Sequence, residues 1–311
     1  MSKNEKTTHG KTNTTRTYRV AGHLFSVNIP SEILAANDHL MAAYRPFETE
    51  GDSEQPLFSL SVKATEEIQK PEDFAEETRQ TEDGQTIVSG SLADGSKGIA
   101  YLWGEERAFA QCSQDYTTAT LLATGKRLQH AIDNTLMLLF AFATATHSTL
   151  LFHSSTVVWQ GKGYMFLGVS GTGKSTHSRL WLKNIADTHL LNDDNPVVRI
   201  DSAGTPIVYG SPWSGKTPCY KNEQHPVGAI VMLHQAPENQ IRQASILEGY
   251  VAITESVSGK RWEKTIADGL HTTTEAVLKG SKVFLLGCLP DDDAAKVCWQ
   301  AVSAQREGGE G

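Results

Sequence analysis

The sequence predicts an α/β fold in which a small α+β module precedes a larger domain built around a strand–loop–helix unit. The main observation is a glycine-rich run, Gly168 to Ser175, between an apolar stretch at 164–167 and a helix-forming stretch at 176–186. The second observation is a series of short strand-forming segments within the first 127 residues. The third is the length of 311 residues, which is typical of about two domains.

The predicted organisation has three parts: a disordered polar tail at residues 1–17, a small α+β N-terminal module at 18–127, and the larger domain at 128–305. Apolar residues alternate with polar ones at 57–62, which indicates a strand with one buried face. Asp94-Gly95 predicts a hairpin turn. Further strands are expected at 18–20, 24–29 and 116–123.

A long helix from about Leu128 to Thr146 is expected to open the larger domain. Its apolar character nearly all round indicates burial between layers. One strand is expected from Thr149 through Trp159, and the turn Gln160–Gly163 then leads into the strand that ends at the glycine-rich run.

The composition is typical of a soluble globular protein, with 39% hydrophobic and 21% charged residues. The formal net charge of −8 makes a nucleic-acid backbone an unfavourable partner. Residues 1–17 contain no apolar segment of a signal peptide. The most apolar run, Leu136–Ala145, is about half of the ~20 residues that a membrane span needs. We therefore expect a cytoplasmic protein that binds neither nucleic acid nor membrane.

The four cysteines, Cys112, Cys219, Cys288 and Cys298, contain no Cys-x-x-Cys pair. This spacing argues against a disulfide framework and against a zinc cluster. Cys219 and His225 form one pair of metal-ligand residue types, but no second pair completes it. We therefore expect a core thiol and a surface histidine.

The run Gly168-Val169-Ser170-Gly171-Thr172-Gly173-Lys174-Ser175 fits the phosphate-binding loop (P-loop) pattern G-x-x-x-x-G-K-[ST] without a mismatch. Glycine permits positive φ and a close backbone approach, so N–H groups can surround phosphate oxygens. Lys174 is expected to reach the β- and γ-phosphates of ATP, and Ser175 to ligate Mg²⁺. The dipole of the following helix favours the same anion. The residues expected to bind the nucleotide are Gly168, Ser170, Gly171, Thr172, Gly173, Lys174, Ser175 and Thr176.

A second motif, Leu190-Leu191-Asn192-Asp193-Asp194, predicts a strand that ends in two carboxylates. Phosphoryl transfer uses carboxylates to hold Mg²⁺ and to accept the proton of the attacking hydroxyl. Nineteen residues separate Lys174 from Asp193, which is room for a helix, a turn and an adjacent strand that returns beside the loop. The alternative is a solvated turn before Pro196, since Asn and Asp favour turns.

His153 lies upstream of the P-loop, on the strand expected to pair with the strand before the loop. That pairing places it near the phosphates. The alternative is a core histidine with its hydrogen bonds satisfied, which is the usual role of a single histidine in an apolar strand.

The run Tyr209–Lys216 is rich in glycine, proline and serine, which predicts a shaped loop. Lys216 is a candidate second phosphate clamp. Trp213 either covers the site or fills the core.

Together these residues resemble one group of nucleotide enzymes, HPr kinase/phosphorylase and ATP-dependent phosphoenolpyruvate carboxykinase. The run 168–176 is very similar to the carboxykinase loop, and Asn192-Asp193-Asp194 is similar to the Gly-Asp-Asp motif of carboxykinases. HPr kinases carry a Gly-Asp-Ser-Gly-Val-Gly-Lys-Ser loop, a later Asp pair and a histidine upstream of the loop. His153 lies at a matching distance, 15 residues before Gly168. The resemblance covers roughly residues 145–300.

The resemblance implies a compact P-loop domain with a mixed, strand-rich sheet, unlike the parallel core of standard P-loop NTPases. It implies that Ser175 and Asp193 hold Mg²⁺, and that Asp194 takes the proton of the substrate hydroxyl with assistance from His153. The two families differ on which aspartate is the metal ligand and which is the base, so that order stays open. Relatives among HPr kinases assemble as oligomers, which implies a homo-oligomer here.

The sequence departs from both families. HPr kinases have Glu-x-Arg-Gly-x-Gly after the Asp pair, whereas this chain has Ile207–Pro212, without the acid or the arginine. This difference argues against HPr as the substrate and against phosphorolysis. Carboxykinases are much longer, and their further metal-binding lysine and histidine and their oxaloacetate-binding arginines have no counterpart identified here.

The leading hypothesis is therefore an ATP- and Mg²⁺-dependent, HPr-kinase-like phosphotransferase. Its acceptor would be a hydroxyl, with serine preferred, of a protein, a peptide or a small molecule. A second hypothesis is a non-catalytic ATP-binding regulator or assembly factor whose N-terminal module binds the partner. A third is activity of the phosphoenolpyruvate carboxykinase type.

Overall fold

The computed structural model describes residues 12–37, 39–51, 53–65, 67–82, 84–215 and 217–304. The chain divides into two compact units: Met1–Tyr18 with Leu24–Leu139, and Arg19–His23 with Phe140–Gly311. The division falls inside the helix α2 (Leu128–Ala143). Within the described ranges, every helix is too short or too polar to cross a membrane.

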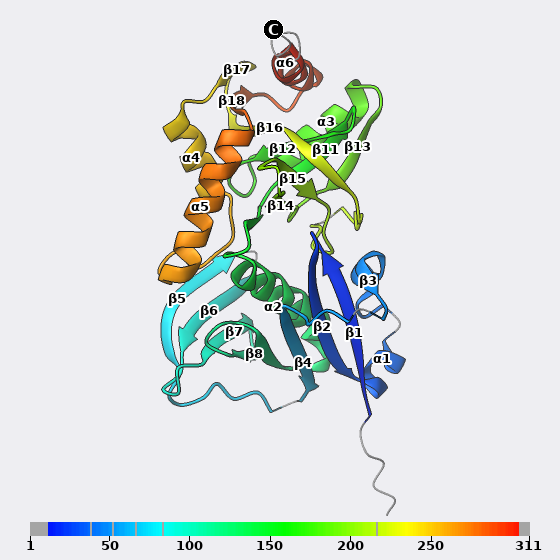
Figure 1. Ribbon diagram of the computed structural model, residues 1–311, viewed down its shortest axis with the longest axis vertical. Helices are drawn as coiled ribbons and strands as arrows, with labels where there is room; N and C mark the ends of the chain where they lie inside the picture. The colour runs from blue at the N-terminus through cyan, green and yellow to red at the C-terminus, as the bar shows by residue number, and fades with distance from the viewer. Residues whose placement is uncertain are drawn as a thin grey trace, which may run out of the picture. The chain divides into compact units, whose positions relative to one another are not determined.

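The N-terminal unit is built on a nine-stranded sheet in the order β3-β1-β2-β4-β9-β8-β7-β6-β5 (Figure 1). Its elements before α2 are β1 (Asn13–Val20), β2 (His23–Pro30), α1 (Ser31–Ala36), a 3₁₀ helix (Ala42–Phe47), β3 (Glu48–Thr49), β4 (Phe58–Ala64), β5 (Ala75–Glu82), β6 (Gln85–Ser91), β7 (Lys97–Trp103), β8 (Glu106–Cys112), β9 (Thr118–Ala123) and a 3₁₀ turn (Gly125–Arg127).

Alternating burial along β4 follows the alternation in its sequence, and the predicted hairpin joins β6 to β7 around Asp94-Gly95. β1 begins at Asn13, so residues 13–17 form a strand where the sequence predicted a disordered tail. The strand forms because β1 lies between β2 and β3 in the sheet and pairs with both, which the local composition did not reveal. Residues 1–11 of that predicted tail lie outside the described residues.

The C-terminal unit has a mixed sheet in the order β10-β14-β15-β16-β12-β11-β13, and β18 and β17 extend it from β16 (Figure 1). Its elements are β10 (Thr149–Leu151), β11 (Ser155–Trp159), β12 (Lys162–Leu167), α3 (Lys174–Asn184), β13 (Thr188–Asn192), β14 (Val197–Ile200), β15 (Pro206–Tyr209), β16 (Gln224–Gln235), β17 (Gln240–Gln243), α4 (Ile246–Glu255), α5 (Lys264–Gly280), β18 (Val283–Cys288) and α6 (Asp292–Ser303).

The sheet of this unit is mixed, as predicted. β12, β16 and β18 run parallel, while β11 is antiparallel to both β12 and β13. α3 and α6 contact each other and pack on this part of the sheet, whereas α5 packs on β10, β14 and β15.

The prediction of one strand from Thr149 through Trp159 is wrong. β10 pairs with β14, whereas β11 pairs with β12 and β13. Between them, residues 152–154 donate their backbone N–H groups to three loop carbonyls, those of Pro196, Ser256 and Asp194. The backbone groups are thus satisfied outside a ladder, and the chain passes from one part of the sheet to another.

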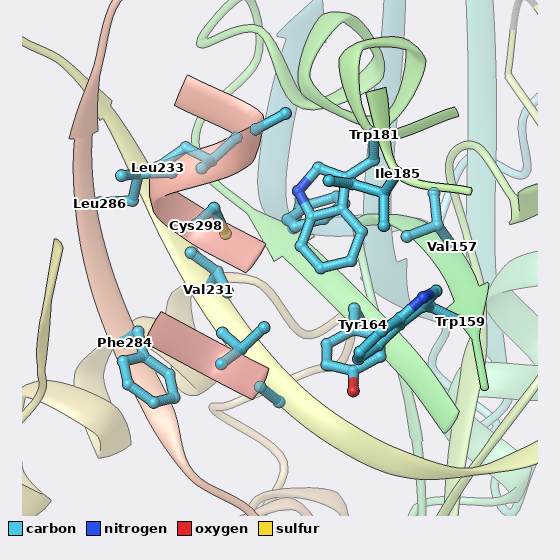
Figure 2. Packing of buried hydrophobic residues seen from close by; sticks show 14 residues of the cluster. Val157, Trp159, Tyr164, Trp181, Ile185, Val231, Leu233, Phe284, Leu286 and Cys298 are labelled. Atoms are coloured by element: carbon cyan, nitrogen blue, oxygen red, sulfur yellow. The ribbon is translucent and has the colours of Figure 1, made fainter. Parts of the chain in front are cut away.

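Trp181 of α3 lies at the centre of the apolar layer between the helices and the sheet (Figure 2). Its side chain is fully buried, and its ring centroid lies 5.2 Å from that of Tyr164 and 5.4 Å from that of Phe166. Cys298 of α6 belongs to the same cluster. Trp181 therefore anchors the helix that follows the P-loop to the strand that precedes it.

We expect Trp181→Ala to lower the free energy of unfolding by about 3–5 kcal/mol, because it removes a fully buried indole and leaves a cavity. Denaturant unfolding monitored by far-UV circular dichroism measures this loss. Trp262→Ala is the matched control, since Trp262 is 48% exposed and lies outside this cluster. Equal destabilisation by the two changes would contradict the central position of Trp181.

His177 occupies the same helix face, with its ring edge-on to Phe166 at a centroid distance of 4.7 Å. Trp181 Nε1 lies 3.2 Å from His177 Nε2 and donates to it, which requires an unprotonated nitrogen there. Burial lowers the pKa of His177 from 6.5 to about 4. Between these two pH values the unfolded chain therefore binds a proton that the folded chain does not bind.

The stabilising effect of neutral His177 is complete above pH 6.5 and is lost as the pH falls towards 4. We expect this residue to account for a loss of about 2 kcal/mol in the free energy of unfolding between pH 7 and pH 5. Urea unfolding at both pH values measures the loss in the wild type and in His177→Gln, which keeps an acceptor but does not titrate. An equal pH dependence in the two proteins would refute this role.

Candidate functional site

The P-loop connects β12 to α3, so the predicted strand–loop–helix order is present. Gly171 and Gly173 have φ values of 79° and 109°, a region that favours glycine. Gly173 is the N-cap residue of α3. The first N–H groups of α3 have no acceptor within the helix, so they are available to an anion in the loop.

Lys174 is the first residue of α3, and its side chain turns back towards the loop. Its side chain is buried, and its Nζ donates to the carbonyl oxygen of Gly168 at 2.8 Å and to that of Val169 at 3.4 Å. Ser175 and Thr176 follow in the first helical turn, and Thr176 Oγ1 accepts a hydrogen bond from Arg179. The ammonium group of Lys174 therefore lies against the backbone of the loop, so its positive charge is beside the glycine-rich run.

The sheet brings the two acidic residues to the edge that carries the P-loop. β12 and β13 are both antiparallel to β11, so they run in the same direction and their carboxyl ends meet at the same edge. The predicted adjacency of these strands is wrong, because β11 lies between them. A bulge at Leu191, opposite Thr156 and Val157, precedes the acidic pair.

Asp193 is tied to the P-loop helix through a buried serine. Its Oδ1 accepts a hydrogen bond from Ser155 Oγ at 2.6 Å, and Ser155 Oγ lies 2.5 Å from Ser178 Oγ. Ser178 lies three residues after Ser175 on α3, so the two project from the same face of the helix. Asp193 is only 8% exposed as a residue, and its carboxylate is therefore held beside the helix turn that carries Ser175.

Asn192 fixes the turn that presents the acidic pair. Its side-chain oxygen accepts from the backbone N–H groups of Asp194 and Asn195 at 2.9 and 2.8 Å. Its amide nitrogen donates to Ser211 Oγ at 3.2 Å and to the Trp213 carbonyl at 3.3 Å. This fully buried amide thus joins the acidic turn to the loop at 210–215.

Asp194 and His153 form a pair at the same edge. His153 Nε2 lies 3.4 Å from Asp194 Oδ1, and Asn195 Nδ2 donates to Asp194 Oδ2 at 2.8 Å. The side chains of His153 and Asp194 are 42% and 35% exposed. His153 is therefore not the core histidine of the alternative interpretation, and this carboxylate is accessible whereas that of Asp193 is enclosed.

The loop after β15 lies against the acidic turn. A Cβ atom on Gly215 would come within 3.2 Å of Asp194 Cβ, so the backbone of this loop packs closely on Asp194. Trp213 is buried with its ring centroid 5.1 Å from that of Phe140, which favours the core role over a cover for the site. Lys216, the candidate second clamp, lies outside the described residues.

Cys219 lies behind this loop, with its Sγ 3.3 Å from the carbonyl oxygen of Leu191. Burial raises the pKa of the Cys219 thiol, and the charge of Asp193 raises it further, although Lys221 acts in the opposite direction. The thiol therefore stays protonated at neutral pH and donates a hydrogen bond to β13.

Ser155, Ser178 and Asn195 also belong to the site, although no motif of the sequence predicted them. The polar pair Ser154-Ser155 between apolar strands is a signal for the first of them, since serines within a buried strand need partners. Ser178 and Asn195 have no comparable signal. Ser178 meets Ser155 from a distant segment, whereas Asn195 binds its neighbour Asp194 through a side-chain geometry that only the folded turn defines.

Comparisons with known proteins found distant structural similarities. One of them is to the HPr(Ser) kinase/phosphatase from Coxiella burnetii, with a TM-score of 0.31 and 16% sequence identity, covering 52% of this chain and 99% of that chain. No family model matches the sequence. No curated protein matches it either.

We expect Asn192→Ala to lower the free energy of unfolding by about 2–3 kcal/mol, because it leaves buried backbone and hydroxyl groups without partners. Hydrogen exchange of the backbone amides at 193–195 and 211–215 should accelerate in the same variant. Asn37→Ala is the matched control, since Asn37 is exposed and its side chain donates to Ile33 of the helix that it follows. Unchanged exchange at 211–215 would contradict the link between the turn and the loop.

Proposed function

We propose that this protein is an ATP- and Mg²⁺-dependent phosphotransferase that moves the γ-phosphate to a hydroxyl group, with serine as the preferred acceptor. The observation that carries the proposal is the convergence of three groups at one edge of the sheet. These are the P-loop with Lys174, the enclosed carboxylate of Asp193, and the accessible pair of Asp194 and His153.

The nucleotide would bind with its phosphates in the P-loop. The positive φ values of Gly171 and Gly173 shape a backbone concavity, and the start of α3 supplies N–H donors and the positive end of a helix dipole. Lys174 would exchange its contacts with loop carbonyls for phosphate oxygens. Gly168, Ser170, Thr172 and Thr176 complete the binding run.

The residues present fit a magnesium ion. Mg²⁺ in phosphoryl-transfer sites is bound by one or two oxygen side chains together with substrate phosphates and waters. Ser175 and Asp193 supply such oxygens, and the Ser155–Ser178 contact holds the Asp193 carboxylate beside the helix turn of Ser175. The ion would neutralise charge that develops on the transferred phosphoryl group.

Asp194 is the group proposed to accept the proton of the acceptor hydroxyl, because its carboxylate is the more exposed of the two. The hydroxyl oxygen would form a bond to the γ-phosphorus while the bond to the β–γ bridging oxygen breaks. The products are the phosphorylated acceptor and ADP, and Asp194 then releases the proton to solvent. His153 would orient the Asp194 carboxylate through the 3.4 Å contact.

Lys216 is proposed as a second phosphate clamp. The chain is proposed to form a homo-oligomer in the cytoplasm. The acceptor is a hydroxyl-bearing protein, peptide or small molecule. The alternatives, an ATP-binding regulator and a carboxykinase-type activity, predict a different result in the same assay.

Transfer of label from γ-labelled ATP with Mg²⁺ to fractions of a cell extract tests the proposal. We expect Asp194→Asn to retain ATP binding and to lose transfer by about 10²–10⁴-fold, the range for removal of a general base. Lys174→Ala should lose both ATP binding and transfer. Asp268→Asn is the control, since its exposed carboxylate pairs with Lys264 away from the site.

Transfer at the wild-type rate by Asp194→Asn would show that Asp194 is not the base. ATP binding without transfer by the wild-type protein would instead support the regulator. ATP-dependent conversion of oxaloacetate to phosphoenolpyruvate, followed spectrophotometrically, would support the carboxykinase-type activity.

A further inference from the structure

A second cluster of metal-ligand side chains lies at the other end of β13. It consists of His189 on β13, Glu223 just before β16, and His225 on β16. Their ligand atoms all lie within 4.8 Å of one another. Glu223 Oε2 is 3.1 Å from His189 Nε2 and 3.6 Å from His225 Nε2, and the two imidazole rings are 6.0 Å apart.

These spacings fit one ion. Ligand atoms of a tetrahedral zinc ion lie about 3.4 Å apart, given metal–ligand bonds of about 2.0–2.1 Å. His225 Nε2 is shielded from solvent and has no hydrogen-bond partner among the described residues, although a buried imidazole nitrogen normally has one. A metal ion bound there would satisfy it.

The chemical types of these three ligands indicate which metal the site prefers. Two imidazoles and one carboxylate suit zinc and its first-row neighbours, whereas Mg²⁺ and Ca²⁺ prefer oxygen ligands. The other oxygen of Glu223, Oε1, lies 3.8 Å from Lys221 Nζ, so Oε2 is the oxygen directed to the two histidines. A water molecule would complete four-coordination.

The cluster joins segments that the sheet order keeps apart. β12 and β11 lie between β16 and β13, yet the rings of His225 and His189 are neighbours. The segment at 210–223 also connects this region to β13, since Gly210 donates its backbone N–H to the Glu223 carbonyl and Cys219 donates to Leu191. The same segment carries Gly215, which lies against Asp194.

We propose that His189, Glu223 and His225 bind one zinc-type divalent ion that fixes the edge strand β13 to the start of β16. The ion is structural: it holds the two strands together and restrains the segment that carries Glu223. It is distinct from the proposed Mg²⁺ site, because His189 precedes Asp193 by four residues, roughly 13 Å along an extended strand. The proposal does not depend on the phosphotransferase activity.

Metal binding to the full chain tests this directly, after chelator treatment and in a buffer that contains millimolar Mg²⁺. We expect one equivalent of Zn²⁺ per chain by equilibrium dialysis, and a rise of the melting temperature with Zn²⁺. Co²⁺ should give the visible absorption of a tetrahedral site. Glu223→Gln and His225→Ala should each weaken Zn²⁺ binding by at least about tenfold, because each removes a direct ligand.

His234→Ala is the matched control, since His234 is an exposed histidine on the same strand β16 and lies outside the cluster. It should bind Zn²⁺ as the wild type does. Hydrogen exchange at 210–215 and 217–222 should slow on Zn²⁺ binding in the wild type and in this control only.

The proposal is overturned if the wild type binds no Zn²⁺ at micromolar concentration. It is also overturned if Glu223→Gln and His225→Ala bind Zn²⁺ as tightly as the wild type does. Asp193→Asn, a change in the proposed Mg²⁺ site, should leave Zn²⁺ binding unchanged, which separates the two sites.

Discussion

The antiparallel placement of β11 between β12 and β13 is the constraint on which the site depends. Because both neighbours run opposite to β11, their carboxyl ends lie at the edge where β11 begins. Ser155 is the first residue of β11, and its hydroxyl lies between Asp193 and Ser178 of α3. One buried hydroxyl thus joins the acidic turn to the helix that follows the P-loop.

The interruption between β10 and β11 has a consequence for the same edge. The N–H groups of residues 152–154 bind carbonyl groups of three other loops instead of a strand partner. The backbone N–H of His153 therefore donates to the Ser256 carbonyl, while its imidazole ring faces Asp194. Two regions of the chain, around 194 and 256, thereby determine the position of one imidazole.

β13 connects two clusters of polar side chains. Its carboxyl end delivers Asn192 and the acidic pair to the P-loop edge, and its amino end carries His189 towards Glu223 and His225. The segment at 210–223 contacts both ends, through Gly215 near Asp194 and through Glu223 beside His189. A restraint at the histidine cluster would therefore limit the freedom of the loop that packs on Asp194.

The sequence by itself determined the local features: the strand–P-loop–helix unit, the strand that ends in Asp193 and Asp194, and the loop before Lys216. These depend on residues that are neighbours in the chain, such as glycines at positive φ and an apolar run that ends in acids. Only the tertiary structure decided that β11 separates β12 from β13, that the stretch 149–159 is two strands, and that His189 meets His225. Strand order and register arise from pairings between distant segments, whose side-chain period is the same in many arrangements. The strand–loop–helix unit could therefore be predicted from the sequence, whereas the contacts of Ser155 and of the histidine cluster arise only in the folded chain.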